Sequence, residues 1–257
     1  MEYEIMNMRR DQGVVYICGA GPGDPKLITV RGMELLKSCD VVLYDRLVSV
    51  EIINQIPIGT EKVNVGKSVG SSGQQDYINK VMMEYARHGK KVLRLKGGDP
   101  FIFGRGGEES EFLRSKKIRF EIVPGISSAL ASPAYAGVPL THRKYSSSVA
   151  ITTGHEDPEK ERTGTNWEQL AKAVDTIVIL MGMERLPQII ARLTDSGLSK
   201  MTSVIVIQSG TTSKQRYVYG SLKDIVSKVK KAKIRPPGII VIGEVTSLCN
   251  KLEWFTR

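Results

Sequence analysis

The segment Leu93–Glu109 contains the residue types that point most directly to ligand binding. It holds five glycines and two phenylalanines, and it begins with an apolar run that is typical of a buried strand. Glycines leave the backbone free of side chains, so a flat ligand can approach its N–H and C=O groups closely. The composition therefore predicts a floor for a flat or adenosine-like ligand at the end of this strand.

A second glycine-rich turn, Gly19–Pro25, follows the first predicted strand. Because open α/β sheets bind ligands at the carboxyl ends of their strands, we expect both turns at the same edge of one sheet. The turn resembles a dinucleotide-binding fingerprint only in part, since Pro22 and Pro25 remove N–H donors that a pyrophosphate needs. A tight turn in which Asp24 caps the following helix is the alternative, although three glycines favour a close approach of some ligand to the backbone.

Arg105 and Glu108 are a charged pair within the first segment. They are three residues apart, so a helix would place them on one face. An exposed ion pair contributing about 0.3–0.5 kcal/mol is one interpretation, and contact with a ligand is the other.

The charge balance indicates an anionic partner. Lys and Arg number 37 against 27 Asp and Glu, a net charge of +10. Aromatic residues are only 6% and no long basic run occurs, which favours a small molecule with several carboxylates or phosphates over nucleic acid. The three cysteines and three histidines lack the spacing of a disulfide framework or a metal site, so we expect no metal.

The elements that position these turns alternate between strand and helix. Strands are predicted at 13–18, 40–44, 61–65, 91–96 and 118–123, and helices at 26–38, 49–55, 74–88, 107–115 and 126–136. The helix at 74–88 has the clearest pattern, with Ile78, Val81, Met82 and Tyr85 at helical spacing. This alternation predicts a mostly parallel sheet covered by helices.

The alternation restarts after residues 137–140, which read as a connector. Further strands are predicted at 147–152, 176–181, 203–208, 216–219 and 238–242, and a polar exposed loop at 155–165. We therefore expect two α/β domains, 13–139 and 143–257. No apolar run reaches the ~18–20 residues that cross a bilayer, and residues 1–10 lack the apolar core of a signal peptide, so we expect a cytoplasmic protein without a membrane partner.

Several segments together resemble the tetrapyrrole methyltransferase family. They are Gly19–Pro25, Tyr44–Asp45, Val65–Lys67, Leu93–Glu109, Val123–Ile126, Ala134–Arg143, Thr153–His155, Met181–Gly182 and Gly210–Thr212. The resemblance covers about residues 13–246. It implies the class III methyltransferase fold, two α/β domains with the active site in the cleft between them. The first domain would supply the glycine-rich loops on the substrate side, and the second would complete the S-adenosyl-methionine site.

The resemblance also implies a reaction. The segments match most closely the branch that transfers two methyl groups from S-adenosyl-methionine to carbons 2 and 7 of uroporphyrinogen III. The product is precorrin-2, formed by way of precorrin-1, on the route to sirohaem, cobalamin and haem d1. The substrate is an octacarboxylate, which agrees with the positive net charge because Arg binds carboxylates in a bidentate fork. A homodimer is expected from the family.

Nine residues match the family's S-adenosyl-methionine contacts. They are Pro22, Gly97, Gly98, Asp99, Ile102, Ser127, Ser128, Met181 and Gly210. The carboxylate of Asp99 suits the ribose or the amino group of the cofactor.

Four residues match positions proposed to be catalytic in the family. Asp45 and Lys67 match a proton acceptor and a proton donor, while Arg105 and Glu108 match positions proposed to act on the substrate. A base must remove a proton after methyl transfer, and Arg105 stays protonated, so we expect it to bind acetate or propionate groups. We rank Asp45 first as the base and Glu108 second; Lys67 could act only if it were neutral. For Asp45 the alternative is a loop residue that bonds to local backbone.

Two other functions stay open. One is a different enzyme of the same fold that acts on a later precorrin, on diphthine or on ribosomal RNA. The other is a basic, non-catalytic binding protein. Two observations argue against it: such a protein needs no cofactor site beside its anion site, and aromatic residues for base stacking are scarce.

Overall fold

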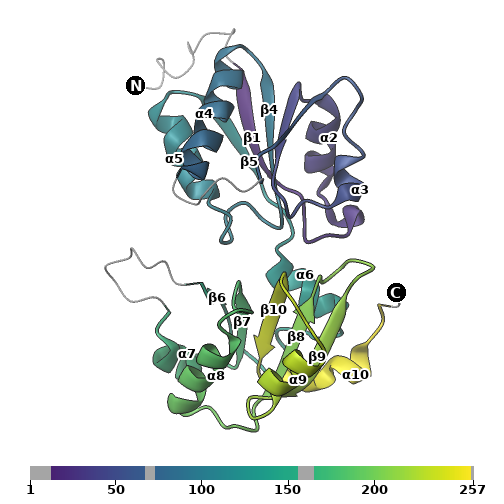
Figure 1. Ribbon diagram of the computed structural model, residues 1–257, viewed down its shortest axis with the longest axis vertical. Coiled ribbons are helices and arrows are strands. Elements are labelled where there is room, and N and C mark those ends of the chain that lie inside the picture. The colour runs from purple at the N-terminus through teal and green to yellow at the C-terminus, as the bar shows by residue number, and fades with distance from the viewer. Residues whose placement is uncertain (1–12, 67–72, 156–164, 256–257) are drawn as a thin grey trace. The chain divides into compact units, whose positions relative to one another are not determined.

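The computed structural model describes residues 13–66, 73–155 and 165–255. The chain divides into two compact units, unit 1 (Met1–Ser127) and unit 2 (Ser128–Arg257). Each unit has a five-stranded sheet among its described residues (Figure 1). The predicted organisation into two α/β parts is confirmed.

The sheet of unit 1 is parallel throughout. Its strands are β1 (Val14–Gly19), β2 (Val41–Tyr44), β3 (Glu61–Asn64), β4 (Lys91–Lys96) and β5 (Arg119–Val123), in the spatial order β3-β2-β4-β1-β5. Each neighbouring pair is parallel, as the alternation predicted. The carboxyl ends of all five strands, and the loops that follow them, therefore lie at one edge of the sheet.

Helices cover both faces of this sheet (Figure 1). Those on one face are α2 (Val30–Ser38) and α3 (Val50–Ile53), and those on the other are α4 (Gln74–Arg87) and α5 (Gly106–Ser115). Because side chains alternate along a strand, Leu93 and Leu95 of β4 pack with the first pair and Val92 packs with the second. The same alternation turns Arg94 and Lys96 toward α4 and α5.

The helix predicted at 26–38 begins later than expected. Residues Pro25–Leu27 form the short 3₁₀ helix η1, and the backbone N–H of Lys26 donates to Asp24 Oδ1 at 2.9 Å. Helix α2 starts at Val30, where Thr29 is the N-cap and its hydroxyl accepts from Gly32 N at 3.1 Å. Asp24 caps the helical turn that directly follows it, η1, as the tight-turn interpretation predicted, whereas α2 begins later and has Thr29 as its own N-cap.

The sheet of unit 2 is mixed. Its strands are β6 (Val149–Thr153), β7 (Thr176–Leu180), β8 (Ser203–Gln208), β9 (Arg216–Ser221) and β10 (Gly238–Ile242), in the order β6-β7-β10-β8-β9. β6 and β7 are parallel, whereas β10 is antiparallel to both of its neighbours and β9 is antiparallel to β8. Since β7 and β8 flank the same antiparallel strand, they run in the same direction and end at the same edge.

Two groups of helices cover the faces of this second sheet. One consists of α7 (Trp167–Ala173), α8 (Leu186–Asp195) and α9 (Ile225–Lys231); the other of α6 (Ser128–Tyr135), the 3₁₀ helix η2 (Glu244–Leu248) and α10 (Cys249–Leu252). The division between the units precedes α6, whereas the predicted boundary at 139–143 followed it. The cause is packing, because Ala129 of α6 shares an apolar cluster with Val178 and Val241 of the second sheet.

Residues 156–164, most of the loop predicted at 155–165, lie outside the described residues. Within the described residues, no helix combines the length and the apolar character needed to cross a membrane.

Replacing Gly19 by Ala tests how closely the loops of unit 1 approach one another. A Cβ atom there would lie 2.4 Å from Gly98 O and 2.6 Å from Gly125 Cα, both backbone atoms. We expect a loss of about 2 kcal/mol in the free energy of unfolding, measured by urea titration. The control is Gly59→Ala, where no atom lies within 4 Å of the new Cβ. Equal stability of the two variants would contradict this close packing.

Candidate functional site

Three glycines bring together the loops that follow β4, β1 and β5. Gly19, Gly98 and Gly125, the glycine junction, lie so close that a Cβ on Gly19 or Gly125 would fall within 2.7 Å of the backbone of the other two. Gly21 and Gly98 exchange backbone hydrogen bonds, from Gly98 N to Gly21 O at 2.7 Å and from Gly21 N to Gly98 O at 3.2 Å. The two glycine-rich turns of the sequence are therefore side by side, as the sheet-edge argument predicted.

Asp99 stabilises this junction. Its Oδ1 accepts from Phe101 N at 2.8 Å and from Ile102 N at 3.2 Å, and its Oδ2 accepts from Gly125 N at 3.0 Å. The carboxylate thus shapes its own loop and ties it to the loop after β5. Asp99 was predicted to contact the ribose or amino group of a cofactor; these three bonds give it a structural role, and that contact stays a prediction.

The other predicted cofactor residues of unit 1 surround the junction in sequence. Gly97 and Gly98 directly follow β4, Pro22 lies in the turn after β1, and Ser127 follows the loop of Gly125. Ile102 is 41% exposed although it is apolar. This side chain therefore offers apolar surface to a ligand at the same edge of the sheet.

Two predicted cofactor residues of unit 2 lie at the common edge of β7 and β8. Met181 directly follows β7, has φ = 52° and is 53% exposed. Gly210 lies just beyond β8, where a Cβ would meet Ser132 Oγ of α6 at 2.3 Å. The third, Ser128, is the first residue of α6. Met181 and Gly210 thus lie just after β7 and β8, two strands that run in the same direction.

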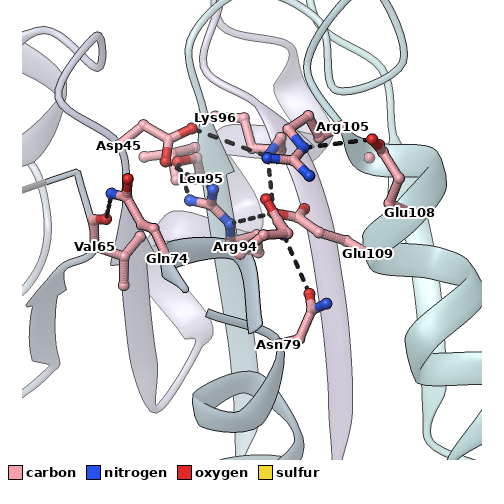
Figure 2. A network of polar contacts seen from close by, with 12 residues as sticks. Asp45, Val65, Gln74, Asn79, Arg94, Leu95, Lys96, Arg105, Glu108 and Glu109 are labelled. Carbon is pink, nitrogen blue, oxygen red and sulfur yellow. Dashed lines mark hydrogen bonds and ion pairs between the residues drawn. The ribbon is translucent and has the colours of Figure 1, made fainter. Parts of the chain in front are cut away.

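A network of four charged side chains lies at the carboxyl ends of β2 and β4 (Figure 2). Arg94 donates from Nη2 to Asp45 Oδ1 at 2.7 Å and from Nε to Glu109 Oε1 at 3.0 Å. Lys96 Nζ donates to the same Glu109 oxygen at 2.9 Å and lies 4.0 Å from Asp45 Oδ2. We call Asp45, Arg94, Lys96 and Glu109 the charge cluster; it contains two cations and two anions.

Three members of the charge cluster are almost fully buried. The exposed fractions of their side chains are 2% for Arg94, 3% for Lys96 and 0% for Glu109, whereas Asp45 is 27% exposed. Burial, assisted by repulsion from Arg94, lowers the pKa of Lys96. Burial also opposes the charge of Arg94, but the carboxylates of Glu109 and Asp45 outweigh it and raise the pKa of Arg94. Asp45 is the member through which the charge cluster reaches the surface.

Glu109 is bonded through one oxygen. Gln75 Nε2 of α4 donates to Oε1 at 3.2 Å, in addition to the two cations. Oε2 is buried and has no hydrogen-bond partner among the residues that the structure describes. A buried carboxylate with one unused oxygen is unusual, since buried polar atoms are nearly always bonded.

The predicted catalytic residues occupy different surroundings. Asp45 belongs to the charge cluster, and its backbone N–H donates to Leu95 O at 3.2 Å, next to β4. Arg105 and Glu108 form an exposed ion pair, Nε to Oε1 at 3.3 Å, with side chains 58% and 57% exposed. Arg105 is the N-cap of α5 at φ = 60° and not a residue of the helix itself. Lys67 lies outside the described residues.

Sequence reasoning missed Arg94, Lys96 and Glu109, although signals for them exist. Two cations alternate with leucines inside a strand that has neighbours on both sides, so both must be buried on the same face. Glu109 lies four residues before the buried Leu113 and therefore belongs to the inner face of α5. Among the residues described here, no group of three or more His, Cys, Asp or Glu side chains is arranged to hold a metal ion.

Known proteins resemble this chain in sequence and in fold. The family model for tetrapyrrole (corrin/porphyrin) methylases matches residues 14–226. An S-adenosyl-L-methionine-dependent uroporphyrinogen III methyltransferase of Methanosarcina barkeri is 48% identical over 242 residues, which are 94% of this chain and 95% of that relative. A siroheme synthase of Pseudoalteromonas atlantica is 46% identical over 95% of this chain, but the chain spans only 53% of its length.

A solved structure has the same fold. It is the crystal structure of a uroporphyrin-III C-methyl transferase from Thermus thermophilus complexed with S-adenyl homocysteine. It is 38% identical, has a TM-score of 0.79, and the match covers 91% of this chain and 99% of that one. The predicted α/β fold class is confirmed.

Replacing Arg94 by Met tests whether unit 1 depends on the charge cluster. The variant leaves the buried carboxylate of Glu109 with Lys96 as its one cation in the charge cluster, so we expect a loss of about 3–5 kcal/mol in the free energy of unfolding. The control is Arg31→Met, which removes an exposed ion pair with Glu121 at 3.1 Å and should cost under about 1 kcal/mol. Urea titrations followed by circular dichroism compare the two. A loss no larger for Arg94→Met than for the control would contradict the prediction.

Proposed function

The chain belongs to the tetrapyrrole (corrin/porphyrin) methylase family, and we propose that it methylates uroporphyrinogen III with S-adenosyl-methionine as the methyl donor. One observation carries the proposal: a relative named for this activity is 48% identical over nearly the full length of both chains. The proposed reaction adds two methyl groups, at carbons 2 and 7, and yields precorrin-2 by way of precorrin-1.

Features of both units support binding of the methyl donor. Gly97 directly follows β4 and precedes the glycine junction, and Ile102 and Met181 are apolar side chains with much of their surface exposed. Backbone polar groups beside apolar surface suit an adenosine ligand. When bound, S-adenosyl-methionine supplies an activated methyl group on a cationic sulfonium. The nine cofactor contacts predicted from the sequence, in both units, remain part of this proposal.

The charges of the chain support a polycarboxylate substrate. The net charge is +10, and the guanidinium of Arg105 is 58% exposed close to the charge cluster in sequence. Its partner Glu108 is equally exposed, so a substrate carboxylate can replace that weak surface contact. We assign Arg105 to holding an acetate or propionate group of the substrate.

Asp45 is the group best placed to accept the proton that leaves the methylated carbon. Arg94 holds Oδ1 at 2.7 Å, while Oδ2 is 4.0 Å from Lys96 Nζ, beyond hydrogen-bond distance. A carboxylate fixed in this way and 27% exposed can take a proton from a substrate at the surface. Glu108 ranks second, because its exposed position fixes its orientation less firmly. Lys67 is retained as the proposed proton donor.

Other properties are proposed from the family and the composition alone. We infer that the protein is a cytoplasmic homodimer that needs no nucleic acid, membrane or metal for its activity.

The decisive experiment is anaerobic incubation with uroporphyrinogen III and S-adenosyl-methionine, followed by mass spectrometry. We expect a gain of two methyl groups on the substrate and formation of S-adenosyl-homocysteine. A parallel incubation without the methyl donor is the control. If uroporphyrinogen III gains no methyl group while a later precorrin does, the chain acts at another step; if neither changes, the proposed activity is wrong.

The role of Asp45 is tested by Asp45→Asn. Without a base we expect kcat to fall about a hundredfold, while the Kd for S-adenosyl-homocysteine, measured by calorimetry, stays nearly unchanged. Asp40→Asn is a matched control. Asp40 directly precedes β2, the strand that Asp45 follows, so it lies at the opposite edge of the sheet, where its Oδ2 accepts from Lys91 N at 2.7 Å. A proportional loss of turnover and cofactor affinity in Asp45→Asn would remove Asp45 from the catalytic residues.

A further inference from the structure

Asp45 lies among charges from two other elements of unit 1 (Figure 2). From β4, Arg94 binds Oδ1 and Lys96 stands 4.0 Å from Oδ2. From α5, Glu109 binds both of these cations, at 3.0 and 2.9 Å. From α4, the uncharged Gln75 bonds to Glu109. Among the described residues, the ion pairs of Asp45 are therefore with two cations, and one anion lies behind them.

Glu109 holds the two cations without touching Asp45. Both of its ion pairs use Oε1, and Oε2 is left buried without a described partner. Apolar residues of similar volume can replace buried ion networks with little or no loss of stability, so folding alone does not explain this arrangement. Clusters of buried titratable groups that open to the surface at one member are typical of functional sites.

We propose that Glu109 and Lys96 are a positioning pair for the reaction, which act through Arg94 and the local field to balance the charge around Asp45 and to hold its carboxylate in a single orientation. The inference rests on the proposed function, because it assigns a purpose to Asp45. Neither Glu109 nor Lys96 is placed in contact with substrate; both act on the residue that is.

Glu109 and Lys96 affect Asp45 in two ways, through the position of Arg94 and through the local charge. Arg94 and Lys96 project from the same face of β4, and Glu109 offsets the repulsion between them. If Glu109 loses its charge, Arg94 keeps only a neutral and weaker acceptor in place of its second carboxylate partner, and the surroundings of Asp45 become more positive. If Lys96 loses its charge, the surroundings of Asp45 become more negative. The two changes should therefore move the pH midpoint of Asp45 in opposite directions.

The first measurement is a carboxyl-carbon NMR titration of aspartate-labelled protein, with Asp45→Asn used to assign the signal. We expect Glu109→Gln to lower the midpoint of Asp45 by roughly one pH unit and Lys96→Met to raise it by a similar amount. The double variant removes one anion and one cation together, so its midpoint should return close to that of the unmodified protein. This readout needs no turnover, and it tests the coupling even if uroporphyrinogen III is not the substrate.

The second measurement is steady-state turnover with uroporphyrinogen III. For Glu109→Gln we expect kcat to fall roughly tenfold or more with little change in KM, and the acid limb of the pH profile to move to lower pH. The double variant should recover part of this loss. Glu111→Gln is the matched control, since Glu111 is an exposed acid on the same helix and the charge change is the same.

Clear outcomes would overturn the inference. An Asp45 midpoint that is the same in both single variants and in the unmodified protein would show that the pair does not act on Asp45. A double variant no better than Glu109→Gln in either measurement would show a loss of packing and not of charge balance. If Glu109→Gln does not fold, Lys96→Met and the double variant still give the opposed and restored midpoints. Failure of the unmodified protein to methylate uroporphyrinogen III would reject the proposed function separately.

Discussion

Two cations buried in a central strand are the constraint on which the rest of unit 1 depends. Arg94 and Lys96 lie in β4, which has a strand on each side and helices on both faces. Charges in such a position are tolerated only when they are paired, because desolvation costs several kcal/mol per ion. Asp45 after β2 and Glu109 in α5 supply the pairs. The loop after β2 and the start of α5 are consequently tied to the end of β4.

The glycine junction connects the same end of β4 to the other side of the sheet. Directly after Lys96, the chain continues through Gly97 and Gly98 and meets the loops that follow β1 and β5. Asp99 completes the connection by its bond to Gly125 N. Six consecutive residues from Arg94 to Asp99 thus link the carboxyl ends of four strands. Charge pairing acts on one side of β4, and close backbone packing acts on the other.

This division suits the proposed methyl transfer. The side with paired charges presents one partly exposed carboxylate, Asp45, and the side with glycines presents the apolar Ile102. A catalytic base needs a fixed charge, whereas the surface that binds the adenosine part of a cofactor needs to be uncharged. Joining both to one short segment keeps their separation constant. We therefore regard the end of β4, and not the exposed Arg105 and Glu108, as the part of unit 1 that determines the geometry of the site.

The order and type of the elements can be predicted from the amino-acid sequence, because hydrophobic periodicity reports which face of a strand or helix is buried. The parallel sheet of unit 1, the helix at Gln74–Arg87 and the meeting of the two glycine-rich turns were all predictable. Periodicity carries no direction, so the antiparallel β10 was not foreseen. Of two consecutive glutamates, Glu108 was the one predicted to be functional, but the phase of α5 against the sheet turns Glu109 inward. This difference between the two glutamates arises from tertiary packing, because the charges that Glu109 neutralises belong to β4, which is distant from α5 in local structure but adjacent to it in the fold.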